Sequence, residues 1–178
     1  LELAPDGPLA HSLMGRHWLV RDRPDLARPE FVSAHQLDAT NPAHLADIAS
    51  TYQLEGDLYS AQAWFQAAVQ VAPEDPSFWT LLALFYVDAL GDAEEGLLAA
   101  QRAVALAPED PAALDALGWA QFRSGRLTLA ETNLLAALQR APADPAVHYH
   151  LGKLASHLGQ SDRARAASAP CCPGDRSP

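Results

Sequence analysis

The sequence predicts an all-α fold made of stacked, repeated helix pairs, and three observations carry that prediction. A proline preceded by a small residue returns in steps of 34, 34, 35 and 34 residues. Hydrophobic residues make up 49% of the chain, much of it alanine, and β-branched residues are sparse. Apolar residues recur at helical spacing between glycine and proline breaks. A fixed period of this size indicates stacked units rather than one globular core. The five dipeptides are Gly7-Pro8, Asn41-Pro42, Asp75-Pro76, Asp110-Pro111 and Asp144-Pro145.

The third unit, residues 76–110, shows how each helix pair is expected to form. Asp75 suits an N-cap, and Pro76 suits the first helical position, where its missing N–H has no helical partner to lose. Gly91 is expected to end the first helix, and Asp92 to cap the second. Each unit is therefore a helix, a short turn, a second helix and another short turn.

Small residues recur at fixed places in the units. The eighth place from each proline is always glycine or alanine, which lets two helix backbones approach closely. The glycine of the turn comes one place late in the third unit, at Gly91, and this explains the single step of 35 residues. The residues of the eighth place are Gly15, Ala49, Ala83, Gly118 and Gly152.

The period also divides the chain into domains. In the unit that begins at Pro8, Pro24 and Pro29 crowd the second helix, which is therefore expected to begin as late as Pro29. The first seven residues read like the end of a unit, so we expect a piece of a longer array; the alternative is a native start with a chance similarity. The expected divisions are 1–7 as the end of a preceding repeat, 8–41 as a degenerate repeat, 42–75, 76–110 and 111–144 as repeats, 145–168 as a truncated repeat and 169–178 as a disordered tail.

This pattern resembles the tetratricopeptide repeat (TPR) family, whose units carry an aromatic residue, Leu-Gly and Tyr in the first helix. Trp79 matches the aromatic residue, and Leu117-Gly118 and Leu151-Gly152 match the Leu-Gly pair. The resemblance covers nearly the whole chain. It implies a right-handed superhelical solenoid of antiparallel helix pairs, with the first helices lining a concave groove. Closing prolines of the family pattern stand at Pro5, Pro73, Pro108 and Pro142.

Charge and composition exclude several classes of function. The net charge is −10, and residues 42–120 hold twelve acidic residues against one basic residue, Arg102. Such a surface repels phosphate backbones, so nucleic acid is not an expected partner. No apolar run is long enough to cross a membrane. The two cysteines, Cys171 and Cys172, are adjacent and form no disulfide framework, so we expect a cytoplasmic location unless an export signal lies upstream. The Ala, Leu, Arg and Pro content favours a bacterial source.

No catalytic motif is present, so we do not expect an enzyme, a cofactor or a metal. The histidines near the C-terminus are interpreted as chance residues on a helix, because their spacing does not place two of them together for chelation. Those histidines are His148, His150 and His157.

The places that face inward in TPR stacks provide the candidate site. Exposed aromatic residues beside cations are typical of a peptide-anchoring surface. The alternative is that Trp119 or Phe122 packs against a neighbouring repeat. Asp47, Asp88 and Asp115 are expected to disfavour anions elsewhere in the groove. The predicted groove residues are Leu81, Leu84, Trp119, Phe122, Arg123, Tyr149, His150 and Lys153.

These features predict a non-catalytic scaffold that binds a partner protein segment with apolar anchors and an acidic group. The Lys and Asn residues of the family's carboxylate clamp are missing, which disfavours that type of chaperone binding. One alternative is a structural spacer or self-assembly module, and another is a regulatory domain of a larger enzyme. Leu9 and Leu13 are expected to be exposed and to allow self-association through the N-terminal end.

Overall fold

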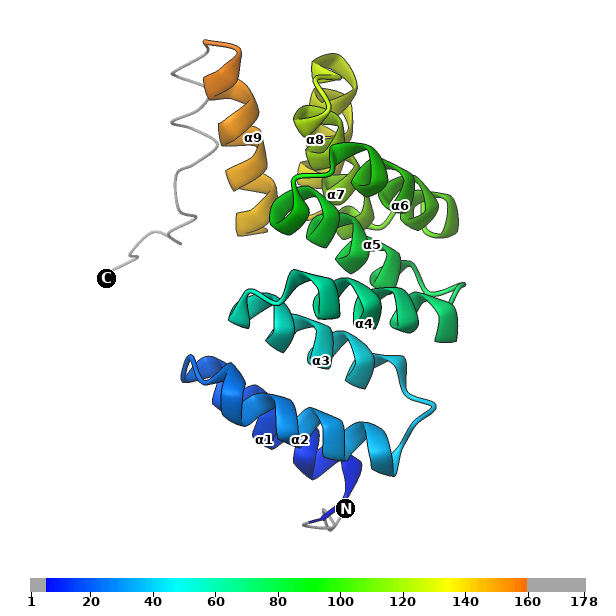
Figure 1. Ribbon diagram of the computed structural model, residues 1–178. Coiled ribbons are helices and arrows are strands. Elements are labelled where there is room, and N and C mark those ends of the chain that lie inside the picture. The colour runs from blue at the N-terminus through cyan, green and yellow to red at the C-terminus, as the bar shows by residue number, and fades with distance from the viewer. Residues whose placement is uncertain (1–5, 160–178) are drawn as a thin grey trace, which may run out of the picture.

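The structure is a computed structural model that describes residues 6–159, and every regular element in that range is a helix. Antiparallel helix pairs stack from α1 and α2 at one end to α9 at the other (Figure 1). For these residues the predicted all-α solenoid is confirmed. The elements are α1 (Pro8–Val20), α2 (Pro24–Leu37), α3 (Pro42–Glu55), α4 (Leu58–Val71), α5 (Pro76–Leu84), η1 (Phe85–Leu90), α6 (Ala93–Leu106), α7 (Pro111–Arg123), α8 (Leu127–Arg140) and α9 (Pro145–His157).

Some expectations fall outside this range. Most of the expected end of a preceding repeat, residues 1–7, and most of the second helix of the truncated repeat lie outside the described residues. The expected tail, 169–178, with both cysteines, also lies outside them. Within residues 6–159, no helix combines the length and the apolar character that crossing a membrane requires.

Capping side chains fix where most first helices begin. In four of the five, the residue before the proline accepts a hydrogen bond from a backbone N–H of the first turn. Each such cap contributes about 0.5–2 kcal/mol. The recurring dipeptide therefore marks helix starts for a chemical reason. The capping residues are Asn41, Asp75, Asp110 and Asp144.

The second helix of the first repeat begins before the latest start that the sequence allows. α2 starts at Pro24 and continues through Pro29. Pro24 takes the first helical position, where no N–H is needed. Pro29 lacks the N–H that would bond to the carbonyl of Asp25, but both residues are exposed, so water can bond to that carbonyl.

One turn residue in each repeat adopts the left-handed conformation. In the first repeat Asp22 holds this place with a φ of 55°, although the sequence shows no glycine there. A short polar side chain tolerates this region better than most because it forms local hydrogen bonds. In the other repeats the residues are Gly56, Gly91, Gly125 and Gly159, with φ between 70° and 82°.

The third repeat absorbs its extra residue in the π-helix η1. In the second repeat, the turn is closed by a hydrogen bond from Asp57 N–H to Tyr52 O, at 2.9 Å. In the third repeat, the corresponding bond from Asp92 N–H to Tyr86 O, at 2.8 Å, spans one residue more. The sequence locates this insertion but predicts an ordinary α-helix as far as the turn glycine, which is wrong. A π-turn is the usual form that one added residue takes inside a helix.

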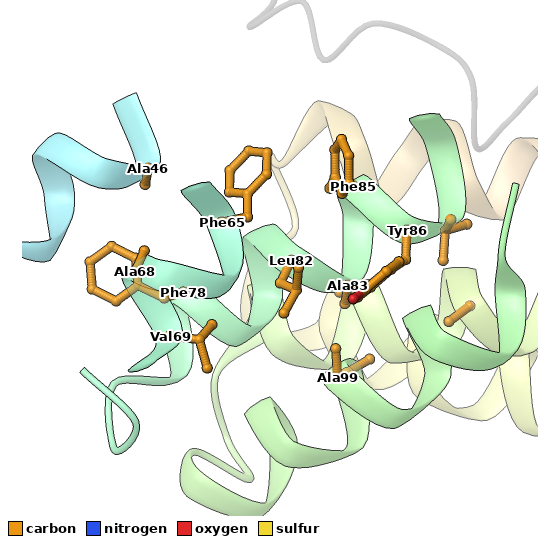
Figure 2. Packing of buried hydrophobic residues seen from close by; sticks show 14 of the residues in the cluster. Ala46, Phe65, Ala68, Val69, Phe78, Leu82, Ala83, Phe85, Tyr86 and Ala99 are labelled. Carbon is orange, nitrogen blue, oxygen red and sulfur yellow. The ribbon is translucent and has the colours of Figure 1, made fainter. Parts of the chain in front are cut away.

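Three clusters of buried side chains hold residues 6–159 together. The largest joins α3, α4, α5, η1, α6 and α7, and it includes Phe65 of α4 against Phe85 of η1, with ring centroids 5.1 Å apart (Figure 2). A second joins α7, α8 and α9 around the fully buried Leu134. The third joins α2 and α3 through Phe31 and Ile48. Each repeat therefore depends mainly on its neighbours, as expected for a solenoid.

A buried histidine joins α3 to α1, and we expect it to make the stability of this end depend on pH. His44 Nδ1 lies 3.2 Å from Ser12 Oγ, and the side chain is buried. Burial lowers the pKa of His44, because the charged imidazolium loses its water. In the unfolded chain the pKa lies near 6.5, so below that pH the unfolded state binds more protons. We therefore expect stability to fall as the pH drops below about 6.5.

The His44→Asn variant should lose less stability at low pH than the parent does. Thermal unfolding at about pH 7.5 and at about pH 5.5 measures it, with His17→Asn on an exposed face of α1 as the control. Burial also raises the pKa of Asp47 on the same helix, an effect of opposite sign that weakens the fold as the pH rises. Comparing variants isolates His44. Equal losses in the parent and in His44→Asn would contradict the prediction.

Candidate partner-binding face

Four of the predicted groove residues meet where α7 packs against α9. The Trp119 ring stacks on the His150 ring with centroids 4.3 Å apart and on the Phe122 ring with centroids 5.2 Å apart. Tyr149 lies 6.2 Å from Trp119, and His157 lies 5.5 Å from Phe122 in an edge-on contact. We call these five residues the aromatic cluster. The surface of α5, η1, α7 and α9 around it is called the first-helix face.

Trp119 is buried rather than exposed. The residue is 5% exposed and belongs to the largest core cluster, and its Nε1–H donates a 2.7 Å hydrogen bond to Asp88 Oδ1. The expectation of an exposed Trp119 is therefore wrong, and the alternative, packing against neighbouring repeats, is correct for this residue. The physical reason is that α9 covers one face of the indole while Asp88 of η1 satisfies its only donor.

His150 is part of a specific buried pair and does not face solvent. Its Nδ1 lies 2.9 Å from each carboxylate oxygen of Asp115, and both side chains are buried. The interpretation of His150 as a chance residue on a helix does not account for this pairing, and Asp115 is not a free carboxylate in an open groove. A signal was available: both positions are inward-facing places, on consecutive first helices. The pair joins α7 to α9, because it satisfies two polar groups that would otherwise be buried without partners.

The two predicted cations differ in what they contact. The Arg123 guanidinium lies 5.6 Å from the centroid of the Trp119 ring and 3.7 Å from Asp88 Oδ1. The Lys153 ammonium lies 5.2 Å from the centroid of the Tyr149 ring and has no carboxylate partner among residues 6–159. Lys153 is therefore the more available cation for a partner.

The two predicted leucines lie on α5, and only one joins the core. Leu84 is half-buried and packs against the cluster that contains Trp119. Leu81 is 40% exposed and is not among the residues packed against that cluster. Tyr149, at 53%, is the other large exposed apolar side chain of the predicted groove set. Leu81 and Tyr149 therefore offer apolar contact area at opposite sides of α7.

Sequence reasoning did not find the structural role of Asp88. Its carboxylate receives the Trp119 hydrogen bond and pairs with Arg123, although the sequence suggests only a free acidic residue in the groove. The late turn glycine was the available signal, because it shows that the end of the third repeat's first helix is altered.

In the described part of the chain, no three His, Cys, Asp or Glu residues are grouped so as to hold a metal ion. The acidic and histidine side chains near Trp119 instead form hydrogen bonds and ring contacts that join helices.

Comparison with known proteins identifies the family. The profile of the tetratricopeptide repeat family matches residues 47–111 and 116–175, which together make up more than half of the chain. The chain belongs to the tetratricopeptide repeat family. TPR arrays are, in general, non-catalytic scaffolds for protein–protein interaction, and their stacked repeats form extended binding surfaces.

One curated relative is a TPR repeat-containing protein of Pseudomonas aeruginosa, 48% identical over 63 residues. The matched segment is 35% of this chain and 10% of that protein, so this chain corresponds to a small part of the relative.

Several solved structures share the fold. A thermophilic TPR protein of Thermus thermophilus superposes with a TM-score of 0.79 at 21% identity, over 90% of this chain and 87% of its own. PilW, a type IV pilus biogenesis factor, gives 0.78 at 20% identity, over 90% and 74%. YrrB, a TPR protein with an unusual peptide-binding site, gives 0.60 at 18% identity, over 92% and 84%. At these identities the likeness concerns the fold alone.

Proposed function

We propose that this chain is a non-catalytic scaffold that holds a segment of a partner protein in a concave groove along the first-helix face. The observation that carries the proposal is the pairing of the exposed Tyr149 ring with the Lys153 ammonium, which has no carboxylate partner in the described range. An exposed ring provides contact area for an apolar side chain, and the ammonium beside it attracts a carboxylate. The TPR fold supports a protein partner in general.

The buried state of Trp119 changes which residues act as anchors. We expect apolar side chains of the partner to contact Tyr149, Leu81 and the exposed edge of the half-buried Phe122. Trp119 is buried beneath these residues and holds α7 against α9. An acidic group of the partner pairs with Lys153, because the Arg123 charge already faces Asp88.

Lys153→Glu should weaken the binding of acidic peptides about two- to tenfold and reduce the salt dependence of binding. Peptides are selected from a phage-displayed library of random short sequences against the parent protein, and affinities are measured by fluorescence anisotropy at low and high salt. Arg21→Glu is the matched control, because it makes the same charge change in the turn between α1 and α2, far from this face.

Two outcomes would overturn this proposal. In the first, the parent protein selects no peptides at all. In the second, Lys153→Glu and Arg21→Glu weaken the binding of the selected acidic peptides equally. In the second case, net charge rather than a site on α9 controls binding.

A second candidate, a self-assembly module, is favoured by a different observation. Leu9, Leu13 and Met14 on α1 are 59%, 50% and 46% exposed, and a shallow cavity of about 350 Å³ lies beside Leu13 and Met14. Apolar surface at the end of a repeat stack tends to be covered by another repeat or by another molecule. A mass that rises with concentration, and that Leu13→Glu restores to the monomer, would support association through α1. A constant monomer mass would count against it.

Location and other partner classes remain predictions. A cytoplasmic site of action is supported by the small number of cysteines. The exclusion of nucleic acid is supported by the net charge of −10.

A further inference from the structure

The extra residue of the third repeat changes what the first-helix face presents. Successive residues of an α-helix are rotated by about 100° around its axis, so one added residue turns the residues that follow it toward another side. η1 contains this addition, and Asp88 lies within it. Both side-chain contacts of Asp88 are with α7, the next first helix.

The side chains of Asp88, Trp119 and Arg123 each contact the other two. Asp88 Oδ1 accepts the Trp119 Nε1–H at 2.7 Å and lies 3.7 Å from Arg123 Nη1. The Arg123 guanidinium in turn lies over the Trp119 ring. The side chains of Asp88 and Arg123 remain 47% and 37% exposed, so both can meet a bound partner. We call these three residues the Asp88 set.

The Asp88 set controls where this face is positive. Arg123 lies beside a carboxylate, and this reduces its attraction for a second anion. Lys153 on α9 has no such neighbour among the described residues, so the net attraction for a carboxylate lies toward α9 rather than over α7. Without Asp88, the Arg123 charge would also be free to attract a carboxylate over α7.

We propose that the one-residue insertion in the third repeat is a selectivity device of the proposed groove. Through Asp88 it neutralises Arg123 and fixes Trp119, so the groove accepts a partner segment whose acidic group lies at Lys153 and disfavours one whose acidic group lies over α7. Asp88 is thus a specificity-determining residue. This inference rests on the proposed function, because it describes the partner class of the same site.

Asp88→Asn tests the proposal directly. The amide oxygen still accepts the Trp119 hydrogen bond, but the charge that faces Arg123 is gone. Glu109→Gln is the matched control: it makes the same change in net charge and also frees an arginine, Arg140, from an exposed ion pair remote from this face. Each protein selects short peptides from the same phage-displayed random library, and the selected sequences are compared for the number and positions of acidic residues.

We expect Asp88→Asn to select peptides with additional acidic positions and to bind them about two- to fivefold more tightly than the parent does, with a steeper salt dependence. Glu109→Gln should select the same sequences as the parent. The indole N–H resonance of Trp119, assigned with Trp119→Phe, should shift in Asp88→Ala and stay close to its parent position in Asp88→Asn. This spectroscopic readout needs no peptide.

The outcomes separate this inference from the proposed function. One outcome is that the parent selects peptides while Asp88→Asn selects the same sequences with the same affinities. In that case the proposal that Asp88 determines selectivity is wrong, and the groove proposal stands. If neither protein selects peptides, both are wrong. An unchanged Trp119 resonance in Asp88→Ala would show that the hydrogen bond within the Asp88 set does not form in solution.

Discussion

Gly118→Leu should lower the free energy of unfolding by about 1–3 kcal/mol or more and loosen the contact between α7 and α8. A methyl group on Gly118 would lie 2.7 Å from Cγ and 3.1 Å from the backbone N of Leu134. Leu134 is fully buried, so it can move aside only by disturbing the side chains packed around it. Leucine gains up to about 1 kcal/mol of helix propensity over glycine, which offsets only part of this overpacking.

Ala112→Leu is the control for this prediction, because Ala112 is an exposed position on the same helix. It should change the free energy of unfolding by less than about 0.5 kcal/mol. Chemical denaturation followed by circular dichroism measures both variants, and hydrogen exchange shows whether the loss is local to α7 and α8. Equal stability of Gly118→Leu and the parent would mean that these two helices do not pack as described.

Spacing in the sequence predicts those features that all the repeats share. Asp110 caps α7 by the same local chemistry with which Asn41 caps α3, so one repeated dipeptide indicates both helix starts. Gly118 is small because a side chain there would meet Leu134 of α8, and Gly15 is small because a side chain there would meet the ring of Phe31. The same place holds glycine or alanine in every unit. Such features are visible in a single sequence because each repeat gives an independent example of them.

Pairings that occur in one repeat only give no periodic signal. The Asp115–His150 pair and the Asp88–Trp119 hydrogen bond each join two particular neighbouring first helices. The burial of Trp119 depends on both contacts at once, together with a π-turn whose form the sequence does not reveal. The sequence therefore assigns Trp119 to the correct face of α7 but cannot show that side chains of η1 and α9 cover its ring.

Trp119→Ala should lower the free energy of unfolding by about 3–5 kcal/mol, the range for removing a large buried aromatic side chain. The change removes ring contacts with His150 and Phe122 and leaves Asp88 without its indole donor. Trp119→Phe separates these effects. It keeps an aromatic ring in place and loses only the N–H and part of the volume, so we expect a smaller loss, about 1–2 kcal/mol.

Denaturation of both variants measures the stability loss, and hydrogen exchange should locate it at α7 and α9, where the aromatic cluster joins the two helices. An exposed anchor would behave differently: Trp119→Ala would keep the stability of the parent and lose about 2 kcal/mol or more of peptide affinity. To distinguish the two interpretations, the affinity for a peptide that the parent selects is measured on the folded fraction of Trp119→Ala. Parent-like stability together with lost binding would assign Trp119 to the binding surface. The opposite result is lost stability together with Lys153-dependent binding that the folded fraction retains. It would show that Trp119 is buried beneath the binding surface, because the partner then contacts Tyr149 and Lys153 without touching the indole.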